Sequence, residues 1–272
     1  MPSRVKDSFA ALRSSGRRGL MPFVTAGDPS LDDLPDLLAA LEAGGATAVE
    51  VGIPFSDPVA DGPVIAESMQ HALRGGVTVA AVFAAVREAR RRVSIPLVAM
   101  LSYSIVYRLG LDRFCEEAAA AGFDGLIIPD LAVEESAESA AAAARAGLTL
   151  SLLVAPSTPP KRAARLAEAS TGFVYVVSRA GITGADKDVP EGLAERVAGL
   201  RAATDLPLAV GFGIASAAQV RQVVGAADAA IVGSALVRRL AGFRGDGHAA
   251  AADAARAFVA ELAAGLPAPA AA

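Results

Sequence analysis

The chain has 272 residues, of which 53% are hydrophobic and 20% are charged, so it holds enough apolar material for a large core and is not of the disordered type. The formal net charge of -4 provides no basic field for a phosphate backbone and argues against a nucleic-acid partner. One cysteine, Cys115, and two histidines exclude an internal disulfide and a Cys/His metal site.

The sequence shows no targeting or membrane signal. Its N-terminus is mixed and charged rather than apolar, and no run of about 18 uncharged apolar residues occurs, the length a membrane helix requires. We therefore expect a cytoplasmic protein that does not enter a membrane. The run Arg90 to Arg92 is expected to be the solvated end of a helix, and Cys115 to fill one face of a helix.

Short β-rich apolar runs alternate with alanine-rich segments of helical spacing, a pattern typical of βα units and a parallel sheet. Ahead of them a helix is predicted in the first ~18 residues, with Val5, Phe9 and Leu12 on one side that suits the bottom of a barrel. The predicted strands are Leu20 to Ala26, Thr47 to Gly52, Ile95 to Leu101, Gly125 to Pro129, Leu148 to Val154, Gly172 to Ser178, Leu208 to Gly211 and Ala229 to Gly233.

Eight such units favour one α/β (β/α)₈ TIM barrel, because an open doubly wound sheet usually stops at five or six strands. The second loop is the longest, and it has room for two helices, near Val64 to Leu73 and Val79 to Arg92. No linker divides the chain. We expect a single barrel domain over residues 1–265 and a disordered tail over 266–272.

Glu50 interrupts the apolar run of the second strand. Side chains alternate along a strand, so Val49 and Val51 share one face while Ala48 and Glu50 share the other. If the valines meet the outer helices, Glu50 points into the barrel mouth, where apolar surroundings would raise its pKa and suit it to general acid catalysis. The alternative is an ion pair with a basic residue of another layer.

The loop "DPVADGPVI" after this strand supplies two more carboxylates. Asp61 lies in a polar setting and is expected to stay ionised, so that it and Glu50 would have different roles. Asp61 and Asp57 are each equally consistent with ordinary turn residues.

Two strand-glycine-helix transitions occur near the C-terminus, "GFGIAS" and "IVGSALVRR". Backbone N-H groups at such places bind phosphate, and barrels often place a phosphate site after strands seven and eight. Gly213, Gly233 and Ser234 are therefore candidate phosphate ligands, although glycines at strand ends are often only turn formers.

The sixth strand leads into the loop "SRAGITGAD", which has the composition of a lid that closes over substrate. A flexible surface loop is the alternative. On the strand itself, Tyr175 and Val177 are expected to point inward, and the Tyr175 hydroxyl then needs a partner.

The sequence resembles the tryptophan synthase alpha subunit family over almost its whole length. The motif "EVGIPFSDPVADGP" matches the family's second-loop signature, and "SRAGITGA", "GFGI" and "GSA" follow in the family's order and spacing. The resemblance implies a barrel lyase that splits indole-3-glycerol phosphate into indole and glyceraldehyde 3-phosphate by a retro-aldol cleavage.

The resemblance also implies roles for individual residues. Glu50 would be the general acid and base, Asp61 would accept a hydrogen bond from the indole N-H, and Thr183 of the lid would reach Asp61. Other implied substrate contacts come from Tyr175 and from an indole-flanking group, and the implied phosphate ligands include a lid glycine. The indole-flanking residues are Phe23, Ile65, Ile127, Phe212 and Ile231, and the phosphate ligands are Gly184, Gly213, Gly233 and Ser234.

The resemblance further implies a partner, a beta subunit that carries pyridoxal phosphate and joins this chain in an α₂β₂ complex; no cofactor is expected in this chain. Pro54 and Asp57 would lie in the interface. The loop after the third strand departs from the family, with Ser104 and Ile105 where Asn and Pro are common. Open alternatives are a free-standing indole-releasing lyase, a non-catalytic activator of a beta subunit, and another phosphate-binding barrel enzyme.

Overall fold

Nine short parallel strands form one sheet in the computed structural model, which describes residues 3–56, 62–178, 191–211, 213–245 and 248–268. They are β1 (Gly19–Thr25), β2 (Val49–Gly52), β3 (Leu97–Met100), β4 (Gly125–Ile127), β5 (Thr149–Ser151), β6 (Leu153–Val154), β7 (Val174–Val177), β8 (Leu208–Gly211) and β9 (Ala229–Val232). Their order in the sheet is β5-β4-β3-β2-β1-β9-β8-β7-β6.

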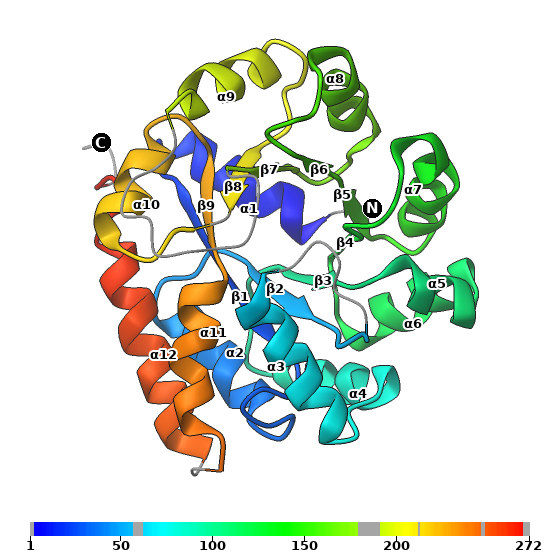
Figure 1. Ribbon diagram of the computed structural model, residues 1–272, viewed down its shortest axis with the longest axis vertical. Coiled ribbons are helices and arrows are strands. Elements are labelled where there is room, and N and C mark those ends of the chain that lie inside the picture. The colour runs from blue at the N-terminus through cyan, green and yellow to red at the C-terminus, as the bar shows by residue number, and fades with distance from the viewer. Residues whose placement is uncertain (1–2, 57–61, 179–190, 212, 246–247, 269–272) are drawn as a thin grey trace.

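The two ends of this order meet in one stretch of chain, because only Leu152 separates β5 from β6. The sheet is therefore a nearly closed barrel (Figure 1). The predicted (β/α)₈ architecture is confirmed, with its fifth strand interrupted where the chain stops pairing with β4 and starts pairing with β7.

Helices surround the strands (Figure 1). As predicted, two of them, α3 (Pro63–Arg74) and α4 (Val79–Ala89), fill the connection between β2 and β3. After β9 come the short α11 (Ser234–Leu240), the 3₁₀ turn η2 (Ala241–Phe243) and α12 (His248–Ala263). The others are α1 (Arg4–Ser14), α2 (Leu34–Ala43), α5 (Tyr103–Leu109), α6 (Leu111–Ala121), η1 (Val133–Glu135), α7 (Ser136–Arg145), α8 (Pro160–Ala169), α9 (Leu193–Arg201) and α10 (Ala217–Val224).

The core has two layers, and strand alternation assigns residues to each. Val49 and Val51 of β2 belong to the outer layer, between the strands and the helices. Ala48 belongs to the inner layer, which fills the barrel. The alternation expected for the second strand is confirmed, and it places the intervening Glu50 on the inner side.

Helix α1 closes the bottom of the barrel. Its three buried side chains, Val5, Phe9 and Leu12, belong to the inner layer, and the ring of Phe9 lies 5.8 Å from that of Phe173. Burying each of these side chains contributes roughly 1.5–3 kcal/mol. The predicted plug is confirmed, and the opposite end of the barrel is left for a site.

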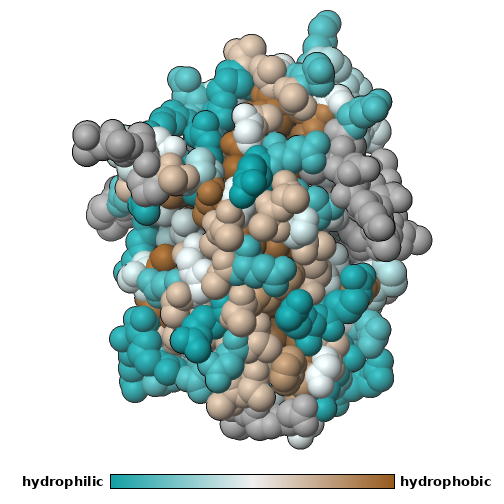
Figure 2. Space-filling model, turned by 90° about the vertical axis from the view of Figure 1, so that its left-hand side faces the viewer, coloured by the Kyte–Doolittle hydropathy of each residue, from teal (hydrophilic) through white to brown (hydrophobic). Residues whose placement is uncertain are grey.

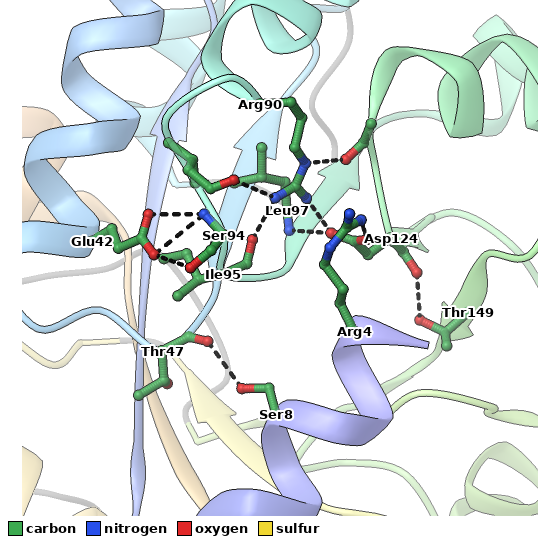
Figure 3. Close-up of polar contacts among 12 residues, drawn as sticks. Arg4, Ser8, Glu42, Thr47, Arg90, Ser94, Ile95, Leu97, Asp124 and Thr149 are labelled. Atoms are coloured by element: carbon green, nitrogen blue, oxygen red, sulfur yellow. Dashed lines mark hydrogen bonds and ion pairs between the residues drawn. The ribbon is translucent and has the colours of Figure 1, made fainter. Parts of the chain in front are cut away.

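Arg90 is largely buried, contrary to the solvated position expected for it. The run that it begins was expected to be solvated, and Arg91 is indeed 75% exposed, but the Arg90 side chain is only 12% exposed. It forms an ion pair with Asp124 and donates from Nη1 to the Ile95 carbonyl over 2.7 Å (Figure 3). The sequence around Arg90 does not reveal that this residue is largely buried, because its partner Asp124 lies more than 30 residues away.

Asp124 stands just before β4 and accepts further hydrogen bonds. The Leu97 backbone N-H donates to its Oδ2 over 2.9 Å, and Arg4 of α1 donates to its Oδ1 over 2.8 Å (Figure 3). This carboxylate thereby connects β3, β4, the end of α4 and the plug helix.

Asp228 stands just before β9 and is bound in the same way. Arg201, at the end of α9, forms an ion pair with it and donates to the Leu206 carbonyl over 2.9 Å. The Leu208 backbone N-H donates to Asp228 Oδ2 over 2.8 Å, and Arg18 lies 3.5 Å from Oδ1. Both aspartates lie at the closed end of the barrel.

Seen from the α12 side, the surface mixes hydrophilic and moderately hydrophobic residues (Figure 2), in keeping with the alanine-rich sequence of that helix. Beyond it Leu266, which the sequence analysis assigned to the tail, packs partly buried against the outer core layer. Within the described ranges no single helix is long and apolar enough to cross a membrane; α3 and α4 together pass on length and composition, but they are bent by 100°.

Candidate active site

A pocket opens at the carboxyl ends of the strands, where barrels of this type carry their active sites. Nearly every strand position contributes to it, along with the loops after β4, β8 and β9 and the start of α3. The lining residues are Phe23, Glu50, Gly62, Ile65, Met100, Ile127, Pro129, Leu153, Tyr175, Gly213, Ile231, Gly233 and Ser234.

Glu50 is the only carboxylate among the described residues that line this pocket, and it is 1% exposed. In the parallel ladder it pairs in register with Phe23 of β1 and Val98 of β3, both of which belong to the inner layer. The pairing explains why its side chain turns into the barrel instead of toward the helices. A carboxylate placed there meets a mainly apolar pocket.

The walls of the pocket are aromatic and aliphatic. Phe23, Ile127 and Ile231 come from strands, and Ile65 comes from the first turn of α3; all four are buried. Tyr175 belongs to the inner layer as expected and is 7% exposed. A flat apolar ring system fits walls of this composition.

Four lining residues were missed by the sequence analysis: Gly62, Met100, Pro129 and Leu153. The alternation that identified Glu50 also identifies Met100, since it lies two residues after the inward Val98 on β3. Leu153 gives no such signal, because the strand is interrupted beside it.

Gly52, two residues after Glu50, allows Phe23 to take its place in the wall. A Cβ at Gly52 would lie 2.6 Å from Phe23 Cζ and 2.9 Å from Met69 Cε, closer than real Cβ contacts. A larger residue here would therefore push the Phe23 ring into the pocket.

The start of α3 is fixed to β1 by buried hydroxyl groups. Thr25 Oγ1 lies 2.6 Å from Ser68 Oγ, and Ser68 Oγ donates to the Ile65 carbonyl over 2.7 Å. These contacts hold Ile65, and with it Gly62, against the strand that carries Phe23.

Three of the candidate phosphate ligands line the pocket and follow the adjacent strands β8 and β9. Gly213 has a φ of +85°, which favours glycine, and follows β8 closely. Gly233 precedes the first turn of α11, and Ser234 begins that helix. The first N-H groups of a helix have no partner within it, so the backbone here can donate to an anion.

The remaining candidates are less completely described. Pro54 is buried and Ser56, two residues further on, is exposed, and the interface role expected for Pro54 stays a prediction. Gly62, which lines the pocket, directly follows Asp61 in the chain. Asp57, Asp61, Thr183, Gly184 and Phe212 lie outside the described residues.

The segment that departs from the family begins helix α5, with Ser102 as the N-cap, and hydrogen bonds fix it in place. Ser102 Oγ donates to Asp130 Oδ2 over 2.7 Å, and the Tyr103 N-H donates to Asp130 Oδ1 over 2.9 Å. Ser104 donates its backbone N-H to Ser102 Oγ over 3.1 Å. Its own side chain is exposed, and that of Ile105 is partly buried against the outer core.

The amino-acid sequence is similar to those of known proteins. The family model described as tryptophan synthase alpha chain matches residues 9–266. The tryptophan synthase alpha chain of Chloroflexus aggregans is 48% identical over 239 residues, which cover 88% of this chain and 90% of that one. The alpha chain of Prochlorococcus marinus is 45% identical and covers 87% of this chain and 86% of its own length.

Solved structures agree with the sequence matches. Tryptophan synthase from M. tuberculosis, in its aminoacrylate-bound form, is 38% identical with a TM-score of 0.84, and the match covers 97% of this chain and 99% of that chain. A mutant alpha-subunit from Pyrococcus furiosus is 33% identical with a TM-score of 0.81, and the match covers 90% of this chain and 98% of that chain. Because sequence and structure agree over nearly the full length, the chain belongs to the tryptophan synthase alpha chain family and acts in tryptophan biosynthesis.

Proposed function

We propose that this chain is a lyase that cleaves indole-3-glycerol phosphate to indole and glyceraldehyde 3-phosphate. The observation that carries the proposal is the placement of Glu50, a buried carboxylate in a mainly apolar pocket that is also lined by Gly233 and Ser234 at the start of α11. The substrate has the matching parts: an indole ring for the apolar walls and a phosphate for the N-H groups.

Glu50 is proposed to begin the reaction as an acid. Its proton moves to C3 of the indole ring, which leaves the positive charge on the ring nitrogen as an iminium. Glu50, now a carboxylate, then takes the proton from the glycerol hydroxyl next to the ring, so that the hydroxyl oxygen forms a carbonyl. The carbon-carbon bond breaks, and its electron pair restores the indole, so that both products leave uncharged at the reacting atoms.

Asp61 is proposed to stabilise the charged intermediate by accepting a hydrogen bond from the indole N-H. Gly62, its neighbour in the chain, lines the pocket, which supports this assignment. Thr183 of the lid is proposed to hold Asp61 when the lid closes, and Phe212 to flank the ring. This chemistry needs no cofactor in this chain, because the protonated indole ring itself accepts the electron pair of the broken carbon-carbon bond.

The phosphate is proposed to bind at Gly184, Gly213, Gly233 and Ser234, mainly through backbone N-H groups. The last three line the pocket and follow the adjacent strands β8 and β9. Such a site needs no lysine, since the first turn of a helix favours an anion through its N-H groups and its dipole.

A beta subunit that carries pyridoxal phosphate is the proposed partner, in an α₂β₂ complex. It would use the released indole. Pro54 and Asp57 of the second loop are proposed to lie in the contact, next to Ser56, which is exposed in this chain.

One experiment tests the proposal and its alternatives. The pure chain is incubated with indole-3-glycerol phosphate, with and without a tryptophan synthase beta subunit, and indole is measured. We expect slow release alone and faster release with the partner. Full activity without the partner would indicate a free-standing lyase. No release in either case, together with activation of the beta subunit, would indicate a non-catalytic activator.

A further inference from the structure

Arg244 joins three segments of the chain through one guanidinium group. It follows η2, and its Nε and Nη2 donate to Oδ1 and Oδ2 of Asp28 over 2.7 and 3.0 Å. Its Nη1 donates to Oε1 of Glu67 over 2.8 Å. Asp28 lies in the connection after β1 and Glu67 lies on α3, so all three guanidinium nitrogens bind groups that are distant in the sequence.

The contact with Asp28 is buried. The Asp28 side chain is 1% exposed and that of Arg244 is 22% exposed, whereas Glu67 is 65% exposed. His71 Nε2 lies 4.0 Å from Asp28 Oδ1, too far for a hydrogen bond, and is 3.1 Å from the Pro29 carbonyl. Without Arg244 the Asp28 carboxylate would therefore be buried with little compensation.

The same three segments meet again at the pocket. β1 carries Phe23, α3 carries Ile65, and Gly233 is the N-cap of α11. A Cβ at Gly233 would be in ordinary contact with both neighbours, 3.8 Å from Phe23 Cβ and 4.0 Å from Ile65 Cδ1. One wall of the pocket is thus assembled from the segments that Arg244 holds together.

We propose that Arg244 is a positioning residue for the phosphate group of the substrate. It holds the far end of α11 against α3 and the β1 connection, and so sets where Gly233 and Ser234 lie. The helix between has seven residues and is roughly 10 Å long, so a displacement at one end is passed to the other as a rigid movement. The inference rests on the proposed function for the identity of the phosphate compound.

A matched control exists at the closed end of the barrel. Arg201 also forms an ion pair with an aspartate and donates to a backbone carbonyl, and its side chain is 36% exposed. It lies away from the pocket. Loss of Arg201 therefore measures what the loss of such an ion pair does to stability alone.

The test compares Arg244→Met, Arg244→Lys, Glu67→Gln and Arg201→Met with the wild type. Three quantities are measured: KM and kcat with indole-3-glycerol phosphate, the dissociation constants of inorganic phosphate and glycerol 3-phosphate, and the midpoint of thermal unfolding. For Arg244→Met we expect KM and both dissociation constants to rise about tenfold or more, with a smaller change in kcat.

The other variants make the outcome decisive. Arg244→Lys should recover part of the phosphate affinity, and Glu67→Gln, an exposed substitution, should raise KM slightly. Arg201→Met should lower the unfolding midpoint and leave KM and phosphate binding within about twofold. Equal phosphate binding by Arg244→Met and Arg201→Met would overturn the inference.

Two results separate this inference from the proposed function. If the wild type does not cleave the substrate, the proposed function fails, and the phosphate measurements alone decide the role of Arg244. If Arg244→Met does not fold, Arg244→Lys and Glu67→Gln decide it, and unchanged phosphate affinity in both overturns it.

Discussion

The backbone of Gly211 lies directly against the phenol group of Tyr175. The two residues are on adjacent strands, β8 and β7, and a Cβ at Gly211 would lie 2.9 Å from Tyr175 Cζ and 3.0 Å from Cε1, with the hydroxyl oxygen closer still. Tyr175 also lines the pocket. The absence of a side chain at one residue therefore determines where the ring of the other lies.

We predict that Gly211→Ala lowers kcat/KM by displacing the Tyr175 ring, and that the loss is smaller when Tyr175 is already Leu. The two substitutions should be non-additive by about 0.5–3 kcal/mol, as for residues in direct contact. A double-mutant cycle of kcat/KM measures this. Strict additivity would contradict the contact, and Gly199→Ala, where a Cβ meets nothing within 4 Å, is the control.

Glu50→Gln is predicted to abolish indole formation without unfolding the protein. The amide keeps the shape of the side chain but cannot pass a proton, and such a role is worth about 10²–10⁴-fold in rate. Asp61→Asn should lose activity as well, because an amide cannot stabilise the cationic ring as a carboxylate does. Indole release and circular dichroism provide the measurements, with exposed Glu168→Gln as the control. Cleavage at the wild-type rate by both variants would refute the mechanism.

Cys115 is predicted to be chemically inert in the folded protein. Burial, chiefly, raises the pKa of its thiol from 9.0 to about 11. At pH 8 the thiolate fraction then falls about 100-fold, and alkylation by iodoacetamide should slow at least as much relative to the denatured chain.

The same shift makes stability depend on pH. The unfolded thiol loses its proton first, so the contribution to stability is complete below about pH 9 and is lost as the pH rises toward about 11. The free energy of unfolding should fall over that window in the wild type and fall less in Cys115→Ala. If iodoacetamide labelled Cys115 in the folded protein as fast as in the denatured chain, that result would contradict the raised pKa of its thiol.

Arg90→Met is predicted to lower the free energy of unfolding by about 3 kcal/mol, because Asp124, 6% exposed, would keep a buried charge without its main partner. Activity at 25 °C should be unchanged, since the pair lies at the closed end of the barrel. Arg91→Met is the matched control: its side chain is 75% exposed and should change stability by less than about 0.5 kcal/mol. Urea unfolding of both variants measures the two changes in the free energy of unfolding.

The local patterns predicted the architecture well because each unit carries its own signal. The period of two along β2 was enough to place Glu50 and the two valines beside it on opposite layers. The stripe of Val5, Phe9 and Leu12 was enough to predict the plug. Both depend on residues only a few positions apart, where periodicity applies.

Contacts between distant residues could not be predicted from local patterns. Arg244 and Asp28 are 216 positions apart, and nothing near either residue indicates the other. The burial of Arg90 is hidden for the same reason. At Leu152 the chain stops pairing with β4 and starts pairing with β7, and both of these partners are distant in the sequence.

The two aspartates at the closed end stand four βα units apart, so a half-turn about the barrel axis carries one arrangement onto the other. Arg90, Ile95 and Leu97 have the same spacing as Arg201, Leu206 and Leu208, with a proline before each final leucine.

This two-fold pseudosymmetry gives the proposed phosphate site a counterpart. Two residues after β8 the chain offers Gly213, and two residues after β3 it offers Ser102, whose hydroxyl is bound to Asp130. A carboxylate there repels a phosphate dianion. The two halves of the barrel are thus alike at the closed end and differ at the mouth, where the half that contains Gly213 carries the proposed phosphate site.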